Sequence, residues 1–338
     1  MTKRENALLA LEGKKPESVP CHFDAVQIVP CSLAMEAPPM GKGPGYDGFG
    51  VHQTPTESAG GMFTPTVGME VLSLDDIDDW EDIVKFPDYS AFSDSDWREA
   101  AAADAARMNL QPENYVQDMF SAKGLFERLH LLMGFEDALC ALMMEPETVY
   151  DIVGAIADHK IRFIEYVAKY YNVDYFTMMD DFSHKDGLFF SINIFRDIFK
   201  PHLKRVVNAV HAHGMIYKQH CCGKMESLLD DFLELCITAF DPVQQLNNIP
   251  EMKKKTLGRA GICGGLDVQN IVDCMQMGIT EVDIRREVRR CIDNYAADGG
   301  YMIYGASLNT HRREARMPGG NLYIVIDECE KYGKNYYL

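Results

Sequence analysis

The segment IFRDIFKPHLKRVVNAVHAHGMIYKQHCCG, residues 194–223, contains the local pattern from which the fold class can be predicted. Its first part places apolar residues three and four apart, which predicts a helix, and Gly214 ends that helix. The short run over 215–220 predicts a strand, and Gly223 allows a sharp turn after it. A helix that leads directly into a short strand is the repeating unit of a parallel α/β sheet.

The same alternation continues on both sides of this unit. It predicts strands at 20–23, 115–120, 173–179, 237–243, 258–263 and 300–305, and helices at 2–13, 126–142, 146–171, 225–235, 280–296 and 320–332. Residues 30–70 are rich in Gly, Pro and Met and predict a long irregular excursion. The predicted fold class is α/β with a parallel sheet. A closed barrel is favoured over a doubly wound sheet, because polar residues follow almost every strand.

The composition and charge restrict the classes of partner. The chain has 338 residues, 47% hydrophobic and 25% charged, which is an ordinary globular composition, and its formal net charge is −18. Such an acidic chain is poorly suited to nucleic acid or an anionic membrane, so neither is expected as a partner. The polar start at 1–6 does not resemble a signal peptide, and no apolar run approaches membrane-spanning length. We expect a cytoplasmic protein whose ten cysteines are mostly reduced.

Residues with metal-binding chemistry lie at the end of the strand over 215–220. His220 and Cys222 are two residues apart, so in extended backbone their side chains point to the same side. An imidazole and a thiolate are ligands that Zn²⁺ prefers. For an isolated pair, the structural alternative is a buried, hydrogen-bonded histidine beside a core cysteine.

Polar side chains also follow the other predicted strands, and in a barrel all of these strand ends meet at one mouth. They are Asp180, Asp181, Asp241, Gln244, Cys263, Asp267, Gln269, Ser307 and Asn309. Asp180 and Asp181 are the candidate catalytic residues. Because neighbouring side chains diverge, we expect one carboxylate to face the cleft for acid–base work or substrate orientation, and the other to cap the following turn.

The candidates for substrate binding are the remaining polar residues expected near the mouth. They are His184, Gln244, Asp267, Gln269 and Ser307, together with His52 from the irregular excursion. Each has a structural alternative: His184 as a loop surface residue, and Asp241 or Gln244 as caps of backbone groups. Cys263 has the alternative of a core cysteine.

Several motifs in order along the chain resemble those of the uroporphyrinogen decarboxylase superfamily. They are DGFGV at 47–51, GLFER at 124–128, GFE at 134–136, DD at 180–181, HCCG at 220–223, DPVQ at 241–244, GGLDVQ at 264–269 and GGY at 299–301. The resemblance spans nearly the whole chain. It implies one (β/α)8 TIM barrel over 1–338, with N-terminal helices and a long loop over 1–110 covering the barrel mouth.

Within that superfamily the chain looks closer to the corrinoid-dependent methyltransferases than to the true decarboxylases. A decarboxylase-like chain would carry an arginine-bearing N-terminal segment, whereas this sequence has no arginine between Arg4 and Arg98. A −18 chain without those cations would repel a polycarboxylate tetrapyrrole. The methyltransferase branch holds Zn²⁺ through H-x-C and a later cysteine, and exchanges methyl groups with a separate cobalamin-binding protein.

The resemblance therefore implies zinc on His220 and Cys222. The position of the later cysteine is Ser307 in this chain, so Cys263 is the expected third ligand, with Cys21 or a carboxylate at the mouth as alternatives. The expected function is methyl transfer between a small methylated substrate (a methoxylated aromatic, methylamine or methylthiol) and a corrinoid carried by a partner protein. The alternatives are a decarboxylase-like lyase without metal and a non-catalytic barrel that binds a tetrapyrrole.

Overall fold

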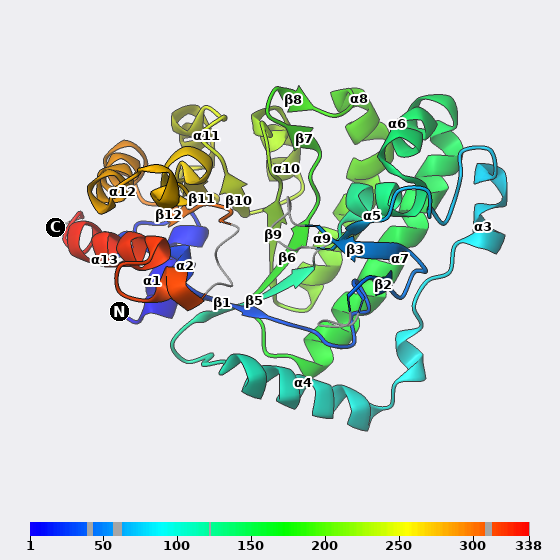
Figure 1. Ribbon diagram of the computed structural model, residues 1–338, viewed down its shortest axis with the longest axis horizontal. Helices are drawn as coiled ribbons and strands as arrows, with labels where there is room; N and C mark the ends of the chain where they lie inside the picture. Colours follow the sequence, from blue (N-terminus) through cyan, green and yellow to red (C-terminus); the bar gives the residue numbers. More distant parts are fainter. Residues whose placement is uncertain (39–42, 57–62, 122, 308–312, 338) are drawn as a thin grey trace.

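The computed structural model describes residues 1–338 except 39–42, 57–62, 122, 308–312 and 338, so Asn309 lies outside the described residues. Its centre is a parallel sheet curled into a half-barrel with helices around it (Figure 1). In sheet order the strands are β1 (Val26–Val29), β5 (Val116–Ser121), β6 (Tyr175–Met179), β9 (Ile216–His220), β10 (Ala239–Val243), β11 (Gly261–Gly265) and β12 (Tyr301–Tyr304). The prediction of a TIM-barrel-like α/β fold is confirmed.

The described part of this sheet has seven strands, whereas the family resemblance implied the eight of a (β/α)8 barrel. The predicted strand at 20–23 is wrong, because His22–Ala25 form a helical turn, α2. The N–H groups of Asp24 and Ala25 donate to the carbonyl of Cys21, which starts that turn. Cys21 alone pairs with Ile303 of β12, in parallel. The segment before β1 therefore meets the last strand at a single bridge.

The predicted helices surround the sheet. They are α5 (Leu125–Met133), α6 (Phe135–Met144), α7 (Pro146–Tyr170), α9 (Lys200–Ala212), α10 (Leu229–Glu234), α12 (Glu281–Tyr295) and α13 (Asn321–Gly333). Two helices differ from expectation: α11 (Ile249–Thr256) occupies a stretch predicted as a connection, and α4 (Asp94–Met108) precedes β5. None of the described helices combines the length and apolar character needed to cross a membrane.

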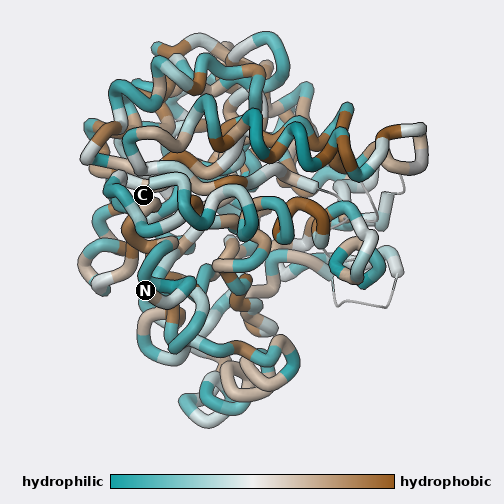
Figure 2. The backbone as a smooth tube through the Cα atoms, turned by 90° about the vertical axis from the view of Figure 1, so that its left-hand side faces the viewer, coloured by the Kyte–Doolittle hydropathy of each residue, from teal (hydrophilic) through white to brown (hydrophobic). Residues whose placement is uncertain are grey.

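Helix α1 (Lys3–Leu11) closes the amino end of the barrel. Its Ala7 and Leu11 belong to a buried apolar cluster with the first residues of three strands, Val116, Tyr175 and Ala239, and with Cys263 and Met302. Arg4 of the same helix pairs with Asp174, just before β6, at 2.5 Å. Figure 2 shows the N and C termini on the same face of the molecule. Because α1 packs against the starts of the strands, the polar residues that follow the strands lie at the opposite end of the barrel.

The excursion over 30–70 contains short strands rather than irregular chain alone. β2 (Gly45–Tyr46), β3 (His52–Pro55) and β4 (Phe63–Pro65) form a small antiparallel sheet. The turn between β2 and β3 is organised by Asp47, whose carboxylate accepts hydrogen bonds from the N–H groups of Phe49 and Val51 and from the Gln53 amide, at 2.8–3.0 Å. The DGFGV motif therefore builds a turn around one buried carboxylate.

A buried ion-pair group ties this turn to the barrel helices. Arg128 of α5 donates to Asp47 at 2.7 Å and to Glu36 at 2.5 Å, and its guanidinium lies 3.7 Å from the centre of the Phe49 ring. Lys160 of α7 also pairs with Glu36. The GLFER and DGFGV motifs thus meet in space, and their charged members compensate one another in the interior.

We predict that Arg128→Leu destabilises the fold strongly, because it leaves the buried Asp47 without its cationic partner. The expected loss in the free energy of unfolding, measured by urea denaturation, is about 3–5 kcal/mol. The matched control is Arg205→Leu, which breaks the half-exposed pair with Asp158. That variant should lose less than about 1 kcal/mol. Equal losses in the two variants would contradict this account of the buried group.

A second prediction concerns acid stability. Burial alone would raise the pKa of Glu36, but Lys160 and Arg128 lower it from 4.5 to about 2. Because the pKa is lower in the folded state, this stabilisation is present above the unfolded pKa and is lost as the pH falls toward the folded one. Glu36→Gln should therefore be less stable than wild type at neutral pH, by roughly 3 kcal/mol. In denaturation measured as a function of pH, the difference in unfolding free energy between wild type and Glu36→Gln should become smaller on acidification. A difference that does not change with pH would contradict the lowered pKa of Glu36.

Candidate functional site

Three of the predicted site residues converge at the carboxyl end of the barrel. His220 ends β9, Cys222 follows two residues later, and Asp181 follows β6. Among the described residues, one potential ligand atom from each of these three lies within 4.8 Å of the other two. The Nε2 atom of His220 is 3.6 Å from the Sγ atom of Cys222. The Cys222 N–H donates to Asp181 Oδ1 at 2.6 Å.

The orientation of His220 is fixed by a carboxylate. Its Nδ1 atom is 2.9 Å from Asp241 Oδ1, and the register of β9 and β10 sets the two residues opposite each other. This contact places the proton on Nδ1 and leaves Nε2 directed at Cys222. The edge-on ring of Phe120, with its centroid 5.4 Å away, packs against the imidazole. A carboxylate behind a histidine is the usual arrangement for a metal-ligating imidazole.

A buried lysine extends this contact into the barrel. Lys218, two residues before His220, pairs with Asp118 at 2.6 Å and with Asp241 at 2.8 Å. Thr177 also donates to Asp118, at 2.5 Å. Burial alone would raise the pKa of Asp241, but Lys218 and His220 together hold it well below its usual range. Burial likewise opposes the charge on Lys218, yet its two carboxylates raise its pKa, so the ammonium stays charged.

The donor set at this end of the barrel fits a zinc ion. In a tetrahedral site with zinc bonds of about 2.0 Å to nitrogen and 2.3 Å to sulfur, those two atoms stand about 3.5 Å apart. The observed separation of His220 Nε2 and Cys222 Sγ is 3.6 Å. Burial and the neighbouring Asp181 raise the pKa of the Cys222 thiol, so a bound cation would be needed to favour the thiolate. Three protein ligands would leave a fourth position for a substrate.

The turn that carries these ligands depends on Gly223. Its φ is +85°, and a Cβ atom there would lie 2.7 Å from the His184 carbonyl oxygen. Its N–H donates to Gln244 Oε1 at 2.7 Å. The structure thus gives Gln244, a predicted substrate-binding residue, the task of holding this turn. His184 lies on β7 (Ser183–His184), where its side chain is exposed and stacks on Phe189.

The two adjacent aspartates have different partners, and Asp180 binds the start of α5 and not the turn after β6. The Asp180 carboxylate is fully buried and accepts from the N–H groups of Leu125 and Glu127, at 2.7 and 3.0 Å, so it caps the start of α5. Asp181 points to His220 and Cys222 instead. The catalytic role remains a prediction for Asp181, while Asp180 has a structural role in this arrangement.

The structure does not bring Cys263 into the group of three ligand atoms. Its side chain is fully buried in the apolar cluster at the amino end of the barrel, beside Met302 and Ala239. The carboxylate of Asp181 stands where a third ligand was expected, which is the alternative that the sequence left open. The metal assignments of His220 and Cys222 remain predictions with a supporting geometry.

The other predicted substrate-binding residues make local contacts. His52 Nδ1 lies 2.8 Å from the Thr66 hydroxyl within the small sheet. Asp267 accepts from the backbone and the side chain of Asn270, while the exposed Gln269 accepts from Cys274 through its carbonyl. Ser307, after β12, donates to Asp273 at 2.8 Å. Their roles in substrate binding remain predictions.

Two charged residues of the site were missed from the sequence. Asp118 and Lys218 lie inside short apolar strands, where the cost of burying a charge made a functional role easy to overlook. The available signal was the spacing, because Lys218, His220 and Cys222 occupy alternate positions and so share one face. Asp241 was recognised at a strand end, but its hydrogen bond to His220 could not be derived from sequence.

A cavity of about 640 Å³ lies beside His220. Two of its lining residues, Phe120 and Asp241, contact the His220 ring. The charged residues Asp118 and Lys218 also line it. Its apolar wall includes Phe23, Val26, Ile28, Leu110, Phe120 and Tyr304. A cavity of this size next to the cluster is the best-placed space for a small-molecule ligand.

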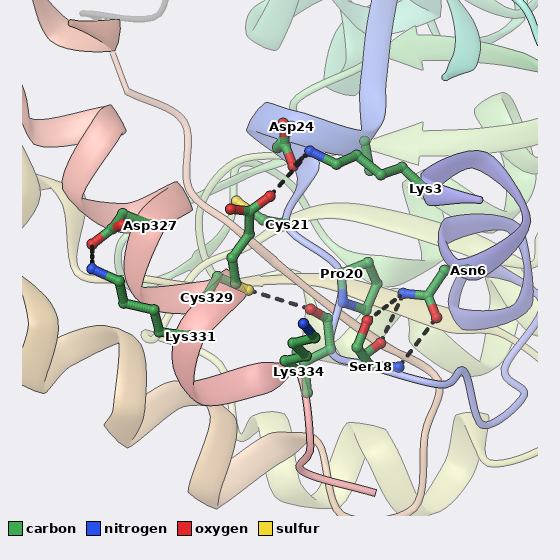
Figure 3. A pocket seen from close by; sticks show the side chains of 13 residues that line it. Lys3, Asn6, Ser18, Pro20, Cys21, Asp24, Asp327, Cys329, Lys331 and Lys334 are labelled. Atoms are coloured by element: carbon green, nitrogen blue, oxygen red, sulfur yellow. Dashed lines mark hydrogen bonds and ion pairs between the residues drawn. The ribbon is translucent and has the colours of Figure 1, made fainter. Parts of the chain in front are cut away.

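A second cavity, of about 490 Å³, is lined by residues of α1, of α13 and of the segment 18–25 between α1 and β1 (Figure 3). Most of its charged lining residues pair with one another: Lys3 with Asp24 and Glu330, and Lys331 with Asp327. The thiol of Cys329 contacts the Val19 carbonyl at 3.3 Å. The lining does not include the residues predicted for catalysis.

The comparisons agree with this architecture. Residues 120–307, more than half of the chain, match the family described as uroporphyrinogen decarboxylase (URO-D), and the protein therefore belongs to that family. A solved methyltransferase structure from Methanosarcina mazei matches with a TM-score of 0.65 and 12% identity, over 98% of this chain and 99% of that chain. At this identity the likeness shows the shared fold. No curated protein matches in sequence.

We predict that Gly223→Ala destabilises the chain more than Gly214→Ala. Both residues have positive φ, but a Cβ at Gly214 would meet open space, whereas one at Gly223 would collide with the His184 backbone. The control should cost about 1 kcal/mol of unfolding free energy from backbone strain. Gly223→Ala should lose a further 1–3 kcal/mol or so from the collision. Equal losses in chemical denaturation would show that the backbone at His184 shifts to accommodate the Cβ atom at little cost.

Proposed function

We propose that the protein is a methyltransferase that moves a methyl group between a small methylated substrate and a cobalamin-binding partner protein, with Zn²⁺ held by Asp181, His220 and Cys222. The convergence of these three side chains at the end of the barrel carries the proposal. Membership of the URO-D family supports it, because the sequence resembles the methyltransferase branch of that superfamily. The similar fold of a protein named as a methyltransferase supports it further.

Bound Zn²⁺ would supply Lewis acidity at the oxygen, nitrogen or sulfur atom that loses or gains the methyl group. The chain's own residues prepare the position. Asp241 would accept the Nδ1 proton of His220 and so leave Nε2 as the ligand atom. Lys218 keeps Asp241 ionised, and the N–H of Cys222 fixes one oxygen of Asp181. The ligands are therefore oriented before any cation arrives, which reduces the cost of binding it.

The acidic character of the chain argues against the lyase alternative. A polycarboxylate tetrapyrrole needs several unpaired cations around its acid groups. In the cavity beside His220, Lys218 is already paired with two carboxylates and Arg316 donates to the Phe23 carbonyl. A smaller substrate with few charges fits this cavity better.

We predict that the purified protein contains about one zinc per chain and that the double variant His220→Ala/Cys222→Ala contains none. Removing both the nitrogen and the sulfur ligand leaves a single carboxylate, which cannot retain the ion. Elemental analysis measures the metal, and the change in the visible absorption of the cobalamin-binding protein measures methyl transfer. Both readouts should be lost together in the double variant.

The control is Cys140→Ala, which removes an exposed free cysteine and should leave zinc and methyl transfer unchanged. A double variant that keeps both would refute the mechanism. Wild-type protein without zinc that turns over a porphyrinogen would establish the lyase instead. Protein without zinc that retains a tetrapyrrole but converts neither substrate would establish a binding barrel.

A further inference from the structure

The formal charges that line the cavity beside His220 nearly balance one another. Asp118 and Asp241 share Lys218, and Asp24 pairs with Lys3. Arg316 also lines the cavity and donates to the carbonyl of Phe23 at 2.9 Å, so Lys218 and Arg316 together equal Asp118 and Asp241 in formal charge. A methylammonium ion would need an uncompensated carboxylate, and a methylated carboxylic acid would need an uncompensated base. The pairing within the lining therefore favours a neutral ligand.

One residue that lines this cavity has a buried polar atom without a hydrogen-bond partner. The Nε2 atom of His22 is buried and has no hydrogen-bond partner among the described residues. Burial and the nearby Lys218 lower the pKa of His22 to about 3, so its ring is neutral at physiological pH. An unsatisfied buried nitrogen destabilises the fold, and a ligand recovers that cost by supplying a donor or an acceptor. A hydroxyl group can supply either one.

The walls of the cavity suit a ring. The His22 ring lies 4.2 Å from the ring of Tyr304, measured between centroids, and Phe23 lies 5.4 Å from the same tyrosine. Phe120 completes an aromatic lining on the side toward His220. The volume of about 640 Å³ is in the range that holds a molecule of one or two rings and is far larger than a methylamine requires.

We propose that this cavity binds a neutral hydroxylated ring compound, with its hydroxyl group hydrogen-bonded to His22 and its ring among Phe23, Phe120 and Tyr304. Together with the proposed function, on which this second step rests, the methylated substrate is then a methoxyphenol. It is neither a methylamine nor a methoxybenzoate. The ring would lie next to His220, because Phe120 and Asp241 line the cavity and contact that histidine.

The test compares two ligands that differ by one hydroxyl group. Isothermal calorimetry measures the affinity of the full chain for methoxyphenol and for methoxybenzene, without any cobalamin-binding protein. One hydrogen bond to His22 should give methoxyphenol an advantage of about three- to tenfold. His22→Leu should abolish this advantage while leaving the affinity for methoxybenzene within about twofold, because its apolar side chain still lines the wall.

Two further variants keep the test decisive. His22→Gln retains a hydrogen-bonding group and should retain part of the preference, which guards against a folding defect in His22→Leu. His211→Leu replaces an exposed histidine on α9 and should behave as wild type. A preference for methoxyphenol that survives in His22→Leu overturns the proposal. So does tighter binding of trimethylammonium or methoxybenzoate, or no binding of either neutral ring.

These results separate the two proposals. Selective binding of methoxyphenol with no methyl transfer to a cobalamin-binding protein would overturn the proposed function and leave the cavity assignment standing. Methyl transfer from a methylamine, with no dependence on His22, would overturn the cavity assignment and leave the methyltransferase standing.

Discussion

A lysine buried inside the barrel is the constraint on which the rest of the site depends. Burying an ammonium group costs several kcal/mol unless carboxylates surround it. Lys218 on β9 obtains them from Asp118 on β5 and Asp241 on β10. These strands keep the carboxylates within reach only in the observed register, since a slip by one residue would turn either side chain to the helical face. The charge of Lys218 thereby fixes the strands that present His220.

The irregular N-terminal segment is attached by the same kind of interaction. Arg128 is fully buried and satisfies Asp47 and Glu36, which come from the excursion. The ion pairs around Lys218 and around Arg128 each join segments that are distant in the sequence. Buried charges fix the relative position of these segments more specifically than an apolar contact would. The DGFGV and GLFER motifs could be recognised separately in the sequence. Their contact at the guanidinium of Arg128 could be seen only in the folded structure.

The sequence predicted the parts of the site that follow from periodicity. The alternation of strands and helices gives a parallel barrel, and the spacing of His220 and Cys222 gives a shared face. Two features needed information from elsewhere in the chain. Asp181 rather than Asp180 joins the cluster because the start of α5 supplies two N–H groups to Asp180. Cys263 looked equivalent to Asp181 as a strand-end ligand, yet it belongs to the buried cluster that α1 closes.

Pairing of the interior charges decides what the formal charge of −18 can do. Inside the barrel, Asp118 and Asp241 near the cavity are both paired with Lys218. A ligand in the cavity would therefore be selected by its shape, by aromatic contacts and by the unpartnered imidazole nitrogen of His22, and not by a strong electrostatic potential of one sign. The excess negative charge therefore falls on outer surfaces, where it acts on encounters between proteins. Small-molecule selectivity and partner selection would then be governed by different residues, so the residues around His22 can change without altering the surface that a partner meets.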